Sequence, residues 1–172
     1  AVAMPAECVD AASVDAASRN HCSLAYSTCP NWWRIMSCST GARVTASAID
    51  SAGNVLVAGT VTRGAGSSVW RIERWDPALS VLLSATEYNG PSNGTNYAWS
   101  IAVDPAGNVI VAGYQWTFSF SDWRIRKYNP TLSALLASTV YNGPGNGGDA
   151  VRGLAVDSGG NILAVGYEDV DP

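Results

Sequence analysis

Apolar and polar residues alternate along most of the chain, and short turn sequences interrupt the alternation at regular intervals. The period of two is typical of β-strands that bury one face. The alternating segments lie at residues 45–50, 54–59, 69–75 and 82–88, then at 100–104, 108–114, 122–128 and 135–141, and finally at 153–157 and 161–167. The pattern therefore predicts an all-β fold made of four-stranded antiparallel sheets.

The sets of segments are copies of one sequence unit. Trp-Arg-Ile at 70–72 recurs at 123–125, and Tyr-Asn-Gly-Pro at 88–91 recurs at 141–144. Several landmarks that keep one period indicate a repeat architecture. We place the units at about 44–96, 97–149 and 150–170, so the last copy contains only the first two strands.

The first two strands of every unit are joined by Asp-x-x-Gly-Asn. An aspartate that opens such a turn accepts backbone N–H groups, and glycine adopts the left-handed conformation without a steric clash. We expect the same structural role in each copy, rather than catalysis or metal binding. The turn residues are Asp50 and Gly53, Asp104 and Gly107, and Asp157 and Gly160.

The complete motif resembles a known repeat. I-A-V-D-x-x-G-N-V-x-V-A-G, followed by D-W-R-I-x-K-Y and Y-N-G-P-G-N-G-x-D, resembles the bacterial β-propeller repeat of large secreted and surface proteins. It is more loosely similar to NHL-type repeats. The resemblance covers residues 44–170 and implies propeller-like four-stranded sheets. Whole propellers have about four to eight blades, so two full units and a half are few.

The N-terminal part of the chain carries one more piece of the unit. Trp-Trp-Arg-Ile at 32–35 resembles the third strand, which the C-terminal half-unit lacks. We therefore expect residues 31–38 to close residues 150–170 into a composite third sheet, either within one chain or between chains. Closure within the chain is favoured by the high local concentration of its two ends. The third-strand arginines Arg34, Arg71 and Arg124 are expected to find acceptors on an adjacent sheet.

All the cysteines lie in the first part of the chain, at Cys8, Cys22, Cys29 and Cys38. Their even number in a polar segment indicates two disulfides and an oxidising compartment, with three pairings open. No C-x-x-C pair is present, which disfavours zinc. We expect a disulfide-stapled, cysteine-rich cap over residues 1–30, followed by the repeat domain over 31–172. The expected location is secreted, extracellular or at the cell surface, with the periplasm as an alternative.

Charge and composition disfavour several classes of function. The net charge of −4 and the lack of a basic run give no reason to expect nucleic acid, and no apolar run is long enough for a membrane span. The only histidine is His21, so acid–base and nucleophile sets are nearly absent and we expect neither an enzyme nor a cofactor. The remaining classes are structural or adhesive proteins and binding modules.

One aromatic run does not follow the repeat. Residues 114–123 read YQWTFSFSDW, whereas the preceding unit has no aromatic residue in the matching stretch before Trp70. In an extended segment Trp116, Phe118 and Phe120 would share one face. We interpret them as a subunit interface, which fits a homo-oligomer or a filament, or as a platform for stacking a glycan. Burial beneath a neighbouring segment is the third alternative.

The loop NGPGNGGD at 142–149 is rich in oxygen ligands. Asn146 and Asp149 could contribute to a calcium site, but the set is short of ligands and the preceding unit has Asn96 in place of the aspartate. A solvated turn is the favoured interpretation. The sequence thus favours an extracytoplasmic structural or interaction protein, such as a surface or filament subunit, with a lectin-like module as the alternative.

Overall fold

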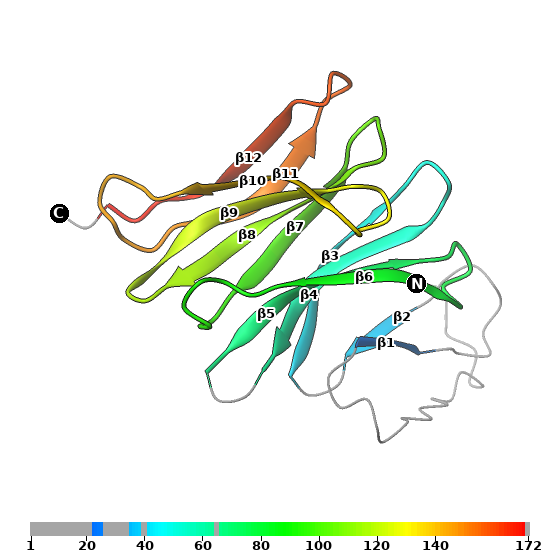
Figure 1. Cartoon of the computed structure of the whole chain (residues 1–172), viewed down its shortest axis with the longest axis horizontal. Coiled ribbons are helices and arrows are strands. Elements are labelled where there is room, and N and C mark those ends of the chain that lie inside the picture. Colours follow the sequence, from blue (N-terminus) through cyan, green and yellow to red (C-terminus); the bar gives the residue numbers. More distant parts are fainter. Residues whose placement is uncertain (1–21, 26–34, 39–40, 64–65, 171–172) are drawn as a thin grey trace, which may run out of the picture.

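The computed structural model describes residues 22–25, 35–38, 41–63 and 66–170, and of the first two segments only the backbone. All the regular structure of these residues is β-strand (Figure 1). Two sheets have four strands each, and all their neighbouring strands pair antiparallel. The prediction of an all-β fold with four-stranded antiparallel sheets is confirmed.

Strands follow one another within each sheet in chain order. The first sheet contains β3 (Ala42–Ile49), β4 (Val55–Thr62), β5 (Ser68–Trp75) and β6 (Leu82–Tyr88). The second contains β7 (Tyr97–Val103), β8 (Val109–Thr117), β9 (Phe120–Tyr128) and β10 (Leu135–Tyr141). The third contains β11 (Ala150–Val156) and β12 (Ile162–Tyr167). A separate pair is formed by β1 (Cys22–Ala25) and β2 (Ile35–Cys38).

The three sheets lie side by side in chain order, and the first strands of neighbouring sheets contact each other (Figure 1). β7 contacts β3 and β4 on one side and β11 on the other. Each first strand also carries a register shift at the same place in the unit. The shifts lie between Val44 and Ala46, between Ala98 and Ser100, and between Val151 and Gly153. Such a bulge bends a strand and increases its twist, so the three first strands are shaped alike.

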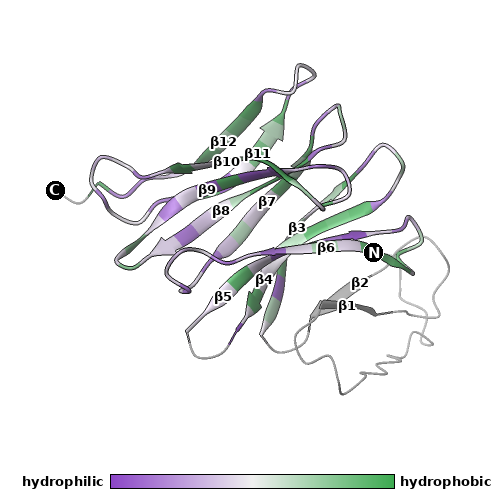
Figure 2. Ribbon diagram, in the orientation of Figure 1, coloured by the Kyte–Doolittle hydropathy of each residue, from purple (hydrophilic) through white to green (hydrophobic). Residues whose placement is uncertain are grey.

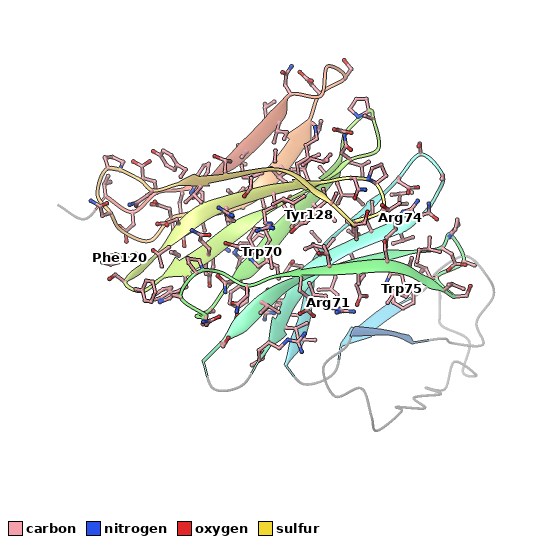
Figure 3. The ribbon with its side chains drawn as sticks, in the orientation of Figure 1. Trp70, Arg71, Arg74, Trp75, Phe120 and Tyr128 are labelled. Carbon is pink, nitrogen blue, oxygen red and sulfur yellow. The ribbon has the colours of Figure 1, made fainter. Side chains whose placement is uncertain are left out.

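The main core fills the space between the first and second sheets. Trp70 and Ile72 of β5 are fully buried there, and they belong to one cluster with Val109 and Val111 of β8 and with Tyr128 (Figure 3). All of these residues occupy alternating positions of their strands, as one buried face requires. The alternation seen in the sequence is therefore used to pack one sheet on the next.

The described part of the segment 31–38, residues 35–38, does not complete the third sheet within the chain, which is the closure we favoured; residues 31–34 lie outside the described residues. β2 pairs with β1, and among the described strands β12 pairs only with β11. The reason is the short link between β2, which ends at Cys38, and β3, which begins at Ala42. Three intervening residues cannot carry a strand across the molecule, so β2 stays beside the first sheet, at the opposite end from β12 (Figure 1).

Candidate interaction surfaces

The aspartates of the repeated turns act through hydrogen bonds inside the turn. Asp104 accepts bonds at 2.9 Å from the backbone N–H of Ala106 and at 2.8 Å from that of Asn108. Asp50 and Asp157 accept the corresponding bonds in their own turns. The glycine of each turn is left-handed, with φ of 82° at Gly53, 83° at Gly107 and 81° at Gly160.

The aromatic run folds back on itself instead of extending. β8 ends at Thr117 and β9 begins at Phe120, with Thr117 opposite Phe120 and Trp116 opposite Ser121. Residues opposite one another share a face of the sheet, so Trp116 and Phe120 lie on opposite faces. The expectation that the three aromatics share one face is therefore wrong. They surround the tip of a hairpin, and Figure 3 shows Phe120 at that end of the sheet.

Trp116 is fixed against the loop that connects the first two sheets. Its N–H donates to Oδ1 of Asn96 at 3.0 Å, and its carbonyl accepts a bond of 2.5 Å from the Ser92 hydroxyl. A Cβ at Gly94 would lie 2.6 Å from the indole, so glycine is needed there. The side chain is nevertheless 37% exposed. The backbone of Trp116 is therefore held in place by hydrogen bonds, and its indole is partly exposed to solvent.

Phe118, in contrast to Trp116, is almost entirely exposed to solvent. It occupies the left-handed region with φ of 44°, and its side chain is 81% exposed. The other described non-glycine residues with positive φ form two pairs that follow the repeat, namely Leu79 with Leu132 and Asn93 with Asn146. The residue that matches Phe118 in the first unit is Ala65, which lies outside the described residues. Phe118 is the first residue of the two-residue turn between β8 and β9, where a positive φ is required, and the turn presents its ring to solvent.

Each sheet is joined to the next by a repeated tryptophan. Nε1 of Trp70 donates to the carbonyl oxygen of Tyr114 at 3.1 Å, and Nε1 of Trp123 donates to that of Tyr167 at 2.7 Å. A second repeated bond joins Tyr88 to Gln115 at 2.5 Å and Tyr141 to Glu168 at 2.6 Å. The repeat therefore determines the contacts between sheets as well as the sheets themselves.

The third-strand arginines do not share one role. Arg71 pairs with Glu73 at 2.6 Å and with Glu87 at 2.9 Å, and both carboxylates belong to its own sheet. Arg124 instead lies over the ring of Tyr88 in the first sheet, 5.1 Å from the ring centre. The expectation of acceptors on an adjacent sheet is thus wrong for Arg71, and Arg124 meets an aromatic face there. Arg34 lies outside the described residues.

The calcium interpretation does not agree with the contacts of the two candidate ligands. Asp149 is fully buried, and its oxygens accept backbone N–H bonds from Gly143 at 2.6 Å and Asp169 at 3.1 Å. Oδ1 of Asn146 accepts a bond of 2.8 Å from the amide of Asn142. N–H groups that point at an oxygen leave it poorly placed for a cation. No cluster of three or more His, Cys, Asp or Glu residues suited to a metal occurs in the described part of the chain.

Sequence reasoning missed a buried carboxylate beside Asp149. Burial raises the pKa of Asp122, a hydrogen bond from Gln115 opposes the rise, and the negative charge of Asp149 adds to it. The preceding unit has the neutral residues Val69 and Asn96 at the matching positions. The replacement of two neutral residues by aspartates between these two units was the feature of the sequence that could have revealed this buried pair.

The cysteine prediction lies largely outside the described residues. Cys8 and Cys29 are not described, and only the backbone of Cys22 and Cys38 is. These two residues lie directly opposite each other in the pair β1–β2. The disulfides and the cap over residues 1–30 therefore stay predictions.

The third sheet presents exposed apolar side chains. Leu163 is 57% and Val165 64% exposed on β12, and Figure 2 shows hydrophobic stretches along β11 and β12. The matching residues of β8, Ile110 and Ala112, are fully buried. The difference arises because the second sheet has two further strands and a following sheet, whereas β12 is an edge.

Comparison with known proteins gives no family assignment. No family model matches the chain, and no curated protein is significantly similar to it. Among the residues that the structure describes, no helix has the length and apolarity needed to cross a membrane.

Proposed function

We propose that the protein is an extracytoplasmic structural or interaction protein, a surface or filament subunit assembled from units of the bacterial β-propeller repeat. The repeated turns, bulges and tryptophan contacts support the view that the three sheets form an arc of a propeller. In this proposal the arc is a scaffold, and protein partners bind to features that depart from the repeat.

The observation that carries the proposal is the tip of the β8–β9 hairpin. Phe118 and Phe120 are exposed there, and Phe118 has the positive φ of the first residue of a two-residue hairpin turn. Exposed aromatic residues of this kind are typical anchors of protein interfaces, because a large ring is desolvated at low entropic cost. We assign the tip to self-association in an oligomer or filament.

Replacement of both phenylalanines tests this assignment. We expect Phe118→Ser with Phe120→Ser to give a folded, smaller species in sedimentation velocity. A matched control replaces Leu136 and Val140 by serine, because these residues of β10 are also exposed apolar side chains. The control should leave the particle size unchanged. Equal sizes for the wild type and the phenylalanine variant would contradict an interface at the tip.

A second candidate function is glycan binding at Trp116. The backbone of Trp116 is fixed on both sides by Asn96 and Ser92, so its indole is an ordered platform for a sugar ring. A glycan panel separates the two functions. Lectin activity should be lost in Trp116→Ala and retained when Phe118 and Phe120 are replaced, whereas assembly should show the reverse dependence.

A further inference from the structure

Arg124 and Arg126 of β9 form a cluster with two tyrosines between the first two sheets. The arginines are two residues apart on one strand, so they share a face of the second sheet. The guanidinium carbon of Arg126 lies 4.1 Å from the centre of the Tyr88 ring, and that of Arg124 lies 5.1 Å from it. Nε of Arg126 also donates to the hydroxyl oxygen of Tyr128 at 2.7 Å, and Tyr128 belongs to the core between these sheets (Figure 3). Two like charges are therefore held beside one aromatic ring.

The matching positions of the first unit contain acids that neutralise the arginine. Arg71 pairs there with Glu73 at 2.6 Å and with Glu87 at 2.9 Å. The residues that replace these two glutamates in the second unit are Arg126 and Val140. One arginine with two carboxylate partners has thus become two arginines without a carboxylate partner. The two units differ in charge at this place although they share the strand pairing around it.

No other acid of the described chain compensates this charge. The ion pairs among the described residues include neither Arg124 nor Arg126. Asp122 shares their face of β9, but its carboxylate is hydrogen-bonded to Gln115. Both arginines are half-buried, and Nε of Arg124 is a buried donor without a hydrogen-bond partner in the same part of the chain. A desolvated cation without an acceptor is costly, so the cluster calls for an anion.

Two neighbouring guanidinium groups favour one kind of anion. Each group presents a planar fork of N–H donors that matches the oxygens of a carboxylate or a phosphate. A carboxylate offers one negative charge and two oxygens, which suffice for one arginine. A phosphate group offers three or more oxygens and up to about two negative charges, so both arginines can share it.

We propose that Arg124 and Arg126 form a binding site for a tetrahedral dianion, namely a phosphate group, between β6 and β9. Tyr88 positions the two guanidinium groups, and the phosphate oxygens take the place that the carboxylates of Glu73 and Glu87 have beside Arg71. Both sheets that form the site contain all four strands of the unit.

The site does not involve the tip of the β8–β9 hairpin or the indole of Trp116. The inference therefore does not depend on self-association through Phe118 and Phe120, or on glycan binding at Trp116. It adds a ligand class that neither of these functions requires.

The probe is inorganic phosphate, titrated into the full chain near neutral pH and at low ionic strength in isothermal titration calorimetry. We expect saturable binding with one phosphate per chain. Arg126→Glu copies the arginine–glutamate pair of the first unit, so it should fold and should weaken binding about tenfold or more. Arg126→Gln removes the charge alone and should weaken binding about threefold. Circular dichroism checks the fold of both variants.

Arg152 supplies the matched control. It also stacks on two aromatic rings, 4.4 Å from the centre of Trp99 and 5.3 Å from that of Tyr167, but it does so as a single arginine. Arg152→Gln should therefore leave the affinity for phosphate unchanged. Equal losses in Arg152→Gln and Arg126→Gln would show unspecific attraction to positive charge and would overturn the proposal.

Competition identifies the ligand. Sulfate is also a tetrahedral dianion and should displace phosphate, whereas acetate at the same ionic strength should not. Displacement by glycerol phosphate would support a phosphoryl group carried on a larger molecule, and a failure of this ester to compete would assign the site to the free ion. The proposal is wrong if phosphate shows no saturable binding, or if acetate competes as well as sulfate.

Discussion

Nε1 of Trp70 lies 3.1 Å from the carbonyl oxygen of Tyr114, so a fully buried indole of the first sheet holds the second strand of the next. Trp70→Phe leaves that partly buried acceptor without its donor. We expect the free energy of unfolding, measured in urea, to fall by about 1–3 kcal/mol.

Trp123 provides the matched comparison. It makes the equivalent bond to Tyr167, but water can reach this contact. Trp123→Phe should therefore cost less than Trp70→Phe, because water replaces the lost donor. Equal losses in the two variants would show that the hydrogen bond is not the main contribution of Trp70.

Because of Asp104, the free energy of unfolding should depend on pH in the acidic range. Burial acts to raise the pKa of Asp104, but the hydrogen bond and charge of Lys127, together with hydrogen bonds from Asn108, lower it to about 2. The folded pKa lies below the ordinary value of 3.8, so the folded protein binds fewer protons than the unfolded chain. The stabilisation is present above about pH 5 and is lost as the pH falls toward 2.

The measurement is the melting temperature between acidic and neutral pH. Lys127→Met should reduce the slope in the acidic range, because Asp104 then loses the partner that lowers its pKa. An unchanged slope would place the acid sensitivity in other carboxylates.

Phe118→Gly should stabilise the protein although it removes a large side chain. Glycine adopts the positive φ of 44° without strain, and the ring that is lost contributes little burial. We expect a gain of about 1 kcal/mol in the free energy of unfolding. Gly107→Ala is the opposite control, since φ there is 83° and a side chain adds strain. A loss of stability in Phe118→Gly would mean that the ring packs in the folded protein.

The register of β1 and β2 predicts one disulfide pairing. Cys22 and Cys38 are direct partners, and Cα atoms of opposed antiparallel residues are about 4.5–5.5 Å apart, which a disulfide can span. We expect a Cys22–Cys38 bond, which leaves Cys8 to pair with Cys29. Peptide mapping without reduction should find both links. A fragment that joins Cys22 to Cys8 or Cys29 would exclude this pairing.

The sequence was sufficient to locate the strands because each unit carries its own turn chemistry. Residues 82–88 and 135–141 were predicted as strands, and β6 and β10 have these bounds. Asp-x-x-Gly-Asn indicates a turn through local hydrogen bonds and one left-handed glycine, and neither needs a distant partner. Such local information can be read from a single sequence.

What could not be predicted depends on distant contacts or on unusual conformations. The prediction for the aromatics in 114–123 depended on an extended run. The turn within that run contains no glycine, asparagine or proline to mark it, and the structure uses Phe118 in a conformation that favours glycine. Arg71 finds Glu73 and Glu87 because all three share one face of the first sheet, whereas the sequence pattern shows only that a partner is required. The position of β2 follows from the length of its link to β3.

The tryptophan contacts between sheets all run in one direction along the chain. Trp70 donates to the second sheet and Trp123 donates to the third, so each of these interfaces joins the third strand of one unit to the second strand of the next. Nearest-neighbour coupling of this kind makes the stability of an array a sum of unit and interface terms. Duplication of a complete unit within the array would therefore add one such interface and leave the others unchanged.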